Sequence, residues 1–270
     1  MKLSTNIRQQ MSLQLQVSLA LDQGIEEVHH ICEEHAHNDS SKLLKAIRRL
    51  YFKNNRLSLF RGVGAQELLR AHEPLFMRVL DLAITRHKGE FRNSGHPYIA
   101  HALSTGFVLS RLGFPPEVIF SGILHDTLED SNHVTDTLNV LYGLNPAIAW
   151  YVLSVSGINT QDAVEKDKQL KVKVESFSEL AGNLFPQVIK CADGIANLYD
   201  VEGMEGRDGR TATQRQRRFL EESQQKLLPW ARQIDEAMLI KVKAKREENF
   251  KLSDYISDCI DNKISMIDPV

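Results

Sequence analysis

The sequence has few cysteines, no long apolar run and almost no net charge. Its 270 residues include 3 cysteines, and their odd number and wide spacing (Cys32, Cys191, Cys259) predict no disulfide framework and suit a reducing compartment. No segment is long and apolar enough to span a bilayer, and the leucine-rich start lacks a signal-peptide cleavage site. We therefore expect a cytoplasmic protein that does not bind a membrane.

The near balance of positive and negative charge gives no indication that the protein binds nucleic acid. The formal net charge is -2, from 33 Lys and Arg against 35 Asp and Glu, so nothing indicates an overall attraction to nucleic acid. An anionic substrate would need a local group of cations. The hydrophobic share of 42% and the charged share of 25% are typical of a soluble globular protein.

Alternating strand patterns are also scarce, and the predicted fold class is all-α. Leu13 to Leu21 alternate with polar residues, but the same residues make contacts four apart on a helix, and we favour a helix there. Helical spacing recurs over residues 43–50, 75–83 and 99–112, and Pro116 suits the first turn of the next helix. Later helices are expected over residues 133–142, 145–156, 163–181, 185–200, 210–229 and 231–248.

Breaks in these patterns predict the domain organisation. Asn54-Asn55 and the glycines of residues 61–64 separate the first part of the chain from its main body. A loop with three glycines precedes the last helices. We expect an N-terminal helical extension (residues 1–70), a catalytic core (71–205) and C-terminal helices that pack on or extend the core (206–270).

The most informative feature is His125-Asp126, which follows the apolar run Val118–Leu124. Charged side chains seldom enter an interior unless they are paired or bind a metal. We expect the pair on a buried helix. His101 upstream and Asp193 downstream complete a set of four candidate metal ligands.

Two imidazoles and two carboxylates suit a divalent transition ion better than Ca²⁺. We favour Mn²⁺, with Fe²⁺, Co²⁺ and Zn²⁺ open. Such an ion acidifies a water molecule and neutralises phosphate charge. Glu129 and Asp130, each four residues after a ligand, are candidates for general base or acid. Asn197, four residues after Asp193, is a candidate to orient the water or a phosphate oxygen. The alternative for Glu129, Asp130 and Asn197 is that they are surface polar residues or helix-end groups.

Three ordered blocks resemble the HD-domain hydrolases of the RelA/SpoT type. They are Arg-Asn-Ser-Gly-His-Pro-Tyr-Ile-Ala-His (92–101), Leu-His-Asp-Thr-Leu-Glu-Asp (124–130) and Lys-Cys-Ala-Asp-Gly-Ile-Ala-Asn-Leu (190–198). The resemblance covers about residues 72–200. It implies an HD-domain helical bundle that removes the 3′-pyrophosphate from guanosine 3′,5′-bis(diphosphate) and its pentaphosphate analogue, usually with Mn²⁺.

The resemblance also implies roles for single residues. It implies metal ligation by the four candidates above, catalytic or water-positioning roles for Glu129 and Asp130, and contact between Asn197 and the substrate. Arg92 matches the family arginine that packs against guanine, and a planar guanidinium suits stacking and phosphate contact.

The chain departs from the family pattern at three positions. Ala102 stands where proline is usual, Gly194 where lysine or arginine is usual, and Tyr199 where arginine often occurs. Loss of these cations weakens the case for a heavily phosphorylated nucleotide, although Lys88 and Lys190 are candidates to replace them. Two alternatives therefore stay open: hydrolysis of another nucleotide or dinucleotide, and a silent nucleotide sensor that binds a partner protein.

Bifunctional members of the family carry a further α/β synthetase domain. About seventy residues follow Asp200 here, and their helical pattern indicates a hydrolase without that domain. The sequence does not indicate an oligomeric state.

Two groups of residues allow both a structural and a functional interpretation. His29–His37, with Cys32, could bind a second metal, but structural zinc sites usually show paired ligands at regular spacing, and we favour a polar helix face. The arginines between Arg207 and Arg218 could contact phosphate; we favour a solvated helix face.

Overall fold

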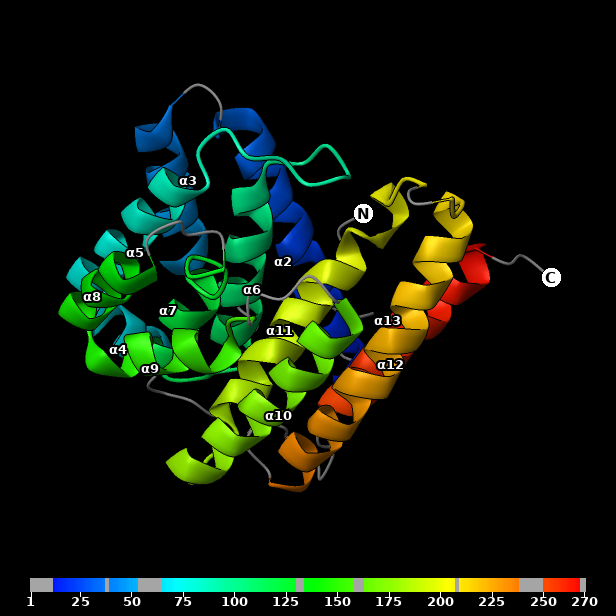
Figure 1. The fold of residues 1–270 in the computed structure, drawn as a ribbon. Helices are drawn as coiled ribbons and strands as arrows, with labels where there is room; N and C mark the ends of the chain where they lie inside the picture. Colours follow the sequence, from blue (N-terminus) through cyan, green and yellow to red (C-terminus); the bar gives the residue numbers. More distant parts are fainter. Residues whose placement is uncertain are drawn as a thin grey trace.

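The computed structural model describes residues 12–36, 39–52, 65–129, 134–157, 163–206, 209–237 and 250–267. These residues form twelve α-helices and no strand, which confirms the all-α fold class (Figure 1). In chain order they are α2 (Leu13–His35), α3 (Ser40–Phe52), α4 (Ala65–Ala71), α5 (Glu73–Arg86), α6 (Tyr98–Arg111), α7 (Pro116–Ile123), α8 (Val134–Leu144), α9 (Pro146–Val155), α10 (Ala163–Ala181), α11 (Phe185–Tyr199), α12 (Ala212–Glu236) and α13 (Leu252–Ile267). A 3₁₀ turn, Val201–Gly203, follows α11.

Helix α6 lies at the centre of the bundle, and every residue from Ile99 to Leu109 is buried. Helices α2, α7 and α11 pack around it (Figure 1). Small residues make this close packing possible: a Cβ at Gly106 would lie 2.2 Å from the side chain of Ile123. A helix buried on all sides is the element best able to hold polar groups away from water.

Helix α2 packs on α6 through an apolar face, and the helix favoured for Leu13–Leu21 is confirmed. At Gly24 the two helices approach so closely that an added Cβ would lie 1.9 Å from the ring of Phe107. The buried apolar residues of α2 include Val17, Leu21, Ile25 and Val28.

The expected helices over residues 133–142, 145–156, 163–181 and 185–200 are confirmed as α8, α9, α10 and α11. Their boundaries follow local signals. Asn145 caps α9 by accepting a hydrogen bond from the backbone N–H of Ala147, as expected for an N-cap asparagine.

The expected break near residue 230 is wrong. Helix α12 continues from Ala212 to Glu236 with Pro229 inside it. Proline removes one backbone hydrogen bond and costs about 3 kcal/mol in a helix interior, but Trp230, Ala231 and Ile234 stay buried on the same face. Their packing outweighs the cost. Of the expected helix 231–248, residues 238–249 lie outside the described residues.

His125-Asp126 does not lie on a helix, contrary to the prediction, because α7 ends at Ile123. Hydrogen bonds to two carbonyls replace the next helical turn. The Nδ1 atom of His125 lies 2.8 Å from the carbonyl oxygen of Gly122. Both the backbone N–H and the hydroxyl of Thr127 donate to the carbonyl of Leu124. The pair is therefore held by a tight turn at the end of α7.

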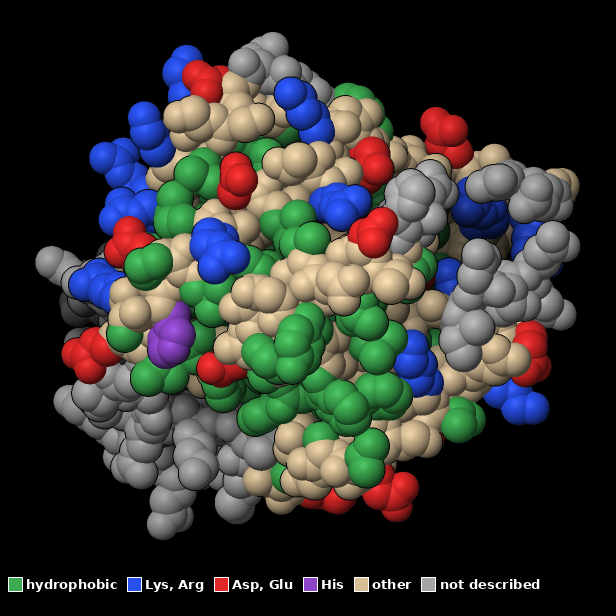
Figure 2. All heavy atoms as spheres, turned by 60° about the vertical axis from the view of Figure 1, so that its left-hand side comes forward, with side chains coloured by type: hydrophobic (Ala, Val, Ile, Leu, Met, Phe, Trp, Pro, Cys, Tyr) green, Lys and Arg blue, Asp and Glu red, His purple; other side chains and the backbone are tan. Residues whose placement is uncertain are grey.

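The exposed face in Figure 2 carries positive and negative side chains in alternation around a group of hydrophobic ones. Neither sign of charge dominates this face, in keeping with the formal net charge of -2. A search of the described helices finds none with the length and apolar character needed to cross a membrane.

Because α2 and α6 approach each other closely at Gly24, alanine should have opposite effects on stability at Gly24 and at Gly143, a glycine with free space around it. Gly24→Ala should lower the free energy of unfolding by about 1–3 kcal/mol, because the methyl group displaces Phe107. Gly143→Ala is the matched control: nothing lies within 4 Å of its Cβ position on α8, so the gain in helix propensity should stabilise by roughly 0.5–1 kcal/mol. Urea unfolding measures both, and equal effects would contradict the packing.

Candidate metal centre

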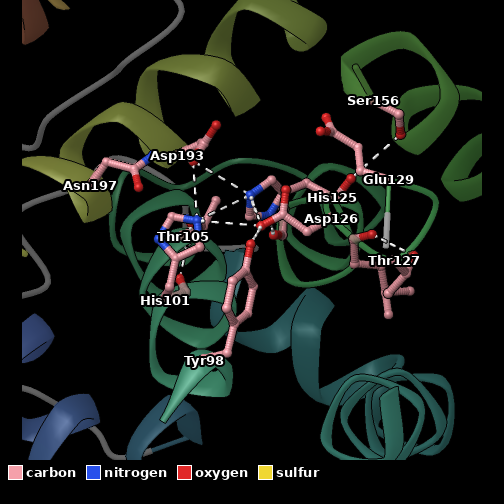
Figure 3. A network of polar contacts seen from close by, with 12 residues as sticks. Tyr98, His101, Thr105, His125, Asp126, Thr127, Glu129, Ser156, Asp193 and Asn197 are labelled. Atoms are coloured by element: carbon pink, nitrogen blue, oxygen red, sulfur yellow. Dashed lines mark hydrogen bonds and ion pairs between the residues drawn. The ribbon is translucent and has the colours of Figure 1, made fainter. Parts of the chain in front are cut away.

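Three elements bring the four predicted ligands together (Figure 3). His101 lies one turn into α6, and Asp193 lies in the middle of α11. His125 and Asp126 come from the turn after α7. We call these four residues the His/Asp cluster. Sequence reasoning therefore selected residues that the fold does place side by side; that they bind a metal stays a prediction.

The imidazoles of the His/Asp cluster each contact both of its carboxylates. The Nε2 atoms of His101 and His125 lie 3.2 Å apart. Asp126 Oδ2 lies 3.0 Å from Nε2 of His125 and 3.6 Å from Nε2 of His101. Asp193 Oδ1 lies 3.2 Å from Nε2 of His101 and 3.4 Å from Nε2 of His125. The donor atoms of His101, His125 and Asp193 all lie within 4.8 Å of one another, a spacing compatible with one divalent ion, whose bonds to nitrogen and oxygen are about 2.0–2.2 Å long.

The tautomer of His125 also suits a metal ligand. Its Nδ1–H donates to the carbonyl of Gly122 at 2.8 Å, so Nε2 is the nitrogen that faces the cluster and that would bind an ion in exchange for its proton. Outer hydrogen bonds of this kind are usual for metal-binding histidines, because they fix the ring orientation.

The electrostatic field of the cluster favours a positive charge. Burial alone lowers the pKa of His125, but Asp126 and Asp193 outweigh it and raise that pKa to about 10. Burial raises the pKa of Asp193, yet Lys190 and His125 hold it well below its ordinary value. Both effects show that the two carboxylates prefer the charged state, as metal-binding carboxylates must.

Three further side chains hold the carboxylates in place. The hydroxyl of Tyr98 donates to Asp126 Oδ2 at 2.8 Å. The Nδ2 amide of Asn197 donates to Asp193 Oδ1 at 2.7 Å, and Lys190 forms an ion pair with Asp193 Oδ2. The sequence interpretation gave Asn197 and Lys190 to the substrate and did not single out Tyr98. Its position three residues before His101, on the same helix face, was the available signal.

Arg92 lies beside the cluster and connects it to the end of α11. Its Nη2 donates to Asn197 Oδ1 at 2.6 Å, and its Nε lies 2.8 Å from Asp200 Oδ2. The guanidinium also stands 5.5 Å from the ring centre of Tyr98. Asp200 was missed by sequence reasoning, because only the fold brings the end of α11 to the loop before α6.

The remaining predicted residues lie farther from the ligands or outside the described chain. Glu129 lines the same cavity, where its carboxylate pairs with Lys166 at 3.0 Å and accepts from the backbone N–H of Gly157. Lys88 is exposed in the turn after α5 and is not part of the cavity lining. Asp130 lies outside the described residues.

The His/Asp cluster forms one wall of a cavity of about 520 Å³, a volume typical of small-molecule sites. The cavity is rich in charge of both signs. Its lining includes Arg92, Asp126, Lys166, Lys190, Asp193 and Asp200. An anionic ligand could therefore meet the metal site and three cations together.

Gly194, which stands where the family pattern usually has lysine or arginine, packs directly against α12. A Cβ at this position would lie 2.3 Å from a methyl group of Leu227, so a larger residue requires the side chain of Leu227 to move. A second cavity of about 260 Å³ opens beside it, between α10, α11 and α12, with Phe219 and Trp230 in its lining. The space beyond Gly194 is therefore lined both by apolar side chains and by three lysines, Lys171, Lys190 and Lys226.

The other two departures lie in packed surroundings. Ala102 is fully buried on α6, and the ring of Tyr199 lies 4.6 Å from that of His29 on α2. Arg215 donates to the carbonyl of Glu205, and Arg218 pairs with Glu222. Neither arginine lines the cavity; Arg207 lies outside the described residues.

Curated relatives match the central part of the chain. A rice (Oryza sativa subsp. japonica) protein named "Probable GTP diphosphokinase RSH3, chloroplastic" is 26% identical over 178 residues, which are 63% of this chain and 24% of that protein. The guanosine-3′,5′-bis(diphosphate) 3′-pyrophosphohydrolase of Spiroplasma citri is 29% identical over 128 residues, 46% of this chain and 16% of that protein. A GTP pyrophosphokinase of Streptomyces coelicolor is 31% identical over 123 residues, 45% of this chain and 14% of that protein.

The chain spans a quarter or less of the length of these relatives. No family model matches it, and no solved structure matches at the threshold used. The resemblance stated from the three sequence blocks is nevertheless confirmed by the relatives. Together with the helical fold and the His/Asp cluster, these matches support the resemblance of this chain to the HD domains of the RelA/SpoT type.

Proposed function

We propose that this chain is a metal-dependent phosphohydrolase that removes the 3′-pyrophosphate of guanosine 3′,5′-bis(diphosphate) or its pentaphosphate analogue. The products would be GDP or GTP and pyrophosphate. The observation that carries the proposal is the grouping of His101, His125 and Asp193, with Asp126 against both imidazoles, at the edge of a charged cavity. Several matching relatives are named as hydrolases of this nucleotide.

The four residues of the His/Asp cluster would hold the ion, and Mn²⁺ is our choice for a mixed nitrogen and oxygen set. When bound, a divalent ion would polarise a phosphoryl oxygen and acidify a water molecule. Tyr98 and Asn197 would keep the two carboxylates oriented toward it, through the hydrogen bonds that they already make.

The remaining side chains of the cavity would bind and orient the nucleotide. Arg92, Lys166 and Lys190 line the cavity, and their charges suit phosphate oxygens. Glu129 lies among them and is our candidate for the proton transfer that accompanies attack of water on phosphorus. Cleavage breaks the bond between the 3′ oxygen and phosphorus, and the 3′ oxygen takes up a proton.

A second candidate function keeps the chemistry and changes the substrate. The cavity beside Gly194, with Phe219 and Trp230 in its lining, lies next to the metal centre and shares Lys190, Asp193 and Asn197 with it. An aromatic base could occupy this cavity. This observation favours another nucleotide, or a dinucleotide, as the alternative substrate.

A nucleotide panel separates the two candidates. Purified protein, freed of metal with EDTA and reloaded with Mn²⁺, should release pyrophosphate and GDP from guanosine 3′,5′-bis(diphosphate), with no turnover while EDTA is present. Chromatography identifies the products. Turnover of a different nucleotide, with none of this one, would establish the second candidate. Tight binding of nucleotide without any product would indicate a sensor.

Loss of a ligand should remove metal and activity together. Asp126→Ala and His125→Ala should each abolish retention of Mn²⁺ and reduce turnover to background, because the remaining donors cannot hold the ion. Metal analysis and pyrophosphate release are the measurements. Asp126→Asn preserves the side-chain volume if the alanine variant does not fold, and Asp81→Ala, an exposed carboxylate on α5, is the control.

Glu129→Gln should leave the metal bound and lower kcat by about 10²–10⁴-fold, because it removes proton transfer without removing a ligand. Metal analysis and the kcat for pyrophosphate release are the measurements. Loss of metal in Glu129→Gln would mean that Glu129 supports the ligands, and an unchanged kcat would mean that it takes no part in proton transfer.

A further inference from the structure

A second group of metal-binding side chains lies at the end of α11, apart from the His/Asp cluster. His29 of α2, His96 of the loop before α6 and Asp200 each offer one ligand atom, and these atoms all lie within 4.8 Å of one another. We call these three residues the second cluster. The polar helix face favoured from the sequence is wrong for His29 and Cys32, because both side chains are buried.

His29 is the least satisfied polar side chain of this cluster. It is only 3% exposed, and neither of its ring nitrogens has a hydrogen-bond partner among the described residues. Its Nδ1 lies 4.0 Å from Oδ1 of Asp200, which is too long for a hydrogen bond. An unsatisfied buried group of this kind is destabilising, and the gap between the two atoms is wide enough for both to bind one ion.

His96 is oriented by a carboxylate of α2. Its Nδ1 lies 2.6 Å from Oε1 of Glu33, one turn after His29 on the same helix. With Nδ1 donating to this carboxylate, Nε2 is the nitrogen left to bind a cation, an arrangement common behind metal-binding histidines. The side chain of His96 is 35% exposed, which provides a route from solvent.

We propose that His29, His96 and Asp200 bind a second divalent transition-metal ion, for which Zn²⁺ is the best-suited chemistry. Two imidazoles and one carboxylate are a common zinc ligand set. The separation of 4.0 Å between His29 and Asp200 is within the roughly 4.2 Å that two metal–ligand bonds can span. The carboxylates of Asp200 and Glu33 outnumber the guanidinium of Arg92, so the surroundings are net negative.

Such an ion would link α2 to Asp200, which lines the cavity beside the His/Asp cluster. It would join α2, the loop before α6 and the end of α11, next to the ion pair between Arg92 and Asp200. Arg92 in turn contacts Asn197, which holds Asp193. The second site does not rest on the proposed function, because its occupancy can be measured without any substrate.

Equilibrium dialysis against Zn²⁺, followed by metal analysis, tests the site. The wild-type chain should bind two ions, and the His125→Ala/Asp126→Ala variant should bind one. Adding His96→Ala to that variant should leave none. His96→Ala alone should bind one ion, whereas His30→Ala, an exposed histidine next to His29 on α2, should still bind two.

Two further measurements distinguish loss of the second site from a failure of the variant to fold. Glu33→Gln changes an exposed side chain and should weaken zinc binding at the second site about 10–100-fold, with an unchanged circular dichroism spectrum. Zn²⁺ should also raise the Tm of the His125→Ala/Asp126→Ala variant. The proposal is overturned if that variant binds no zinc and its Tm does not move, or if His96→Ala still binds two ions.

Discussion

The structure depends on two carboxylates, Asp126 and Asp193, that are placed in the interior of a helical bundle. Isolated buried charges are too costly to persist, and each must find partners. Here the partners come from every neighbouring element: imidazoles from α6 and from the turn after α7, a phenol from the start of α6, and an amide and an ammonium group from α11. The elements that surround the carboxylates are therefore fixed relative to one another by polar contacts as well as by packing.

Much of this arrangement could be predicted from the sequence, because the ligands lie in short blocks with apolar flanks. Helical spacing predicted most of the helices, and the four ligands were selected before the fold was known. The errors have a common cause. The turn at His125 and the continuation of α12 through Pro229 are decided by hydrogen bonds and by buried neighbours from distant parts of the chain, and local spacing contains neither. His29 was assigned to the surface for the same reason: its neighbours, His96 and Asp200, are distant in sequence.

Arg92 lies between the His/Asp cluster and the second cluster. It contacts Asn197, which holds Asp193 of the first, and Asp200 of the second, so one side chain links the two clusters. The resemblance to a known family gave Arg92 a role toward guanine only. In this chain the arginine is already engaged with two partners of α11, and a ligand that uses it must compete with them or bind around them.

The contact between Gly194 and Leu227 makes these two positions interdependent. A side chain at position 194 would place its Cβ 2.3 Å from a methyl group of Leu227, so Leu227 must shift or be replaced by a smaller residue. Replacing Leu227 by itself would leave a hole beside α11. A substitution at either position therefore changes how α12 packs on α11. The space beside the His/Asp cluster is in this way shaped by a helix that supplies none of the four candidate ligands.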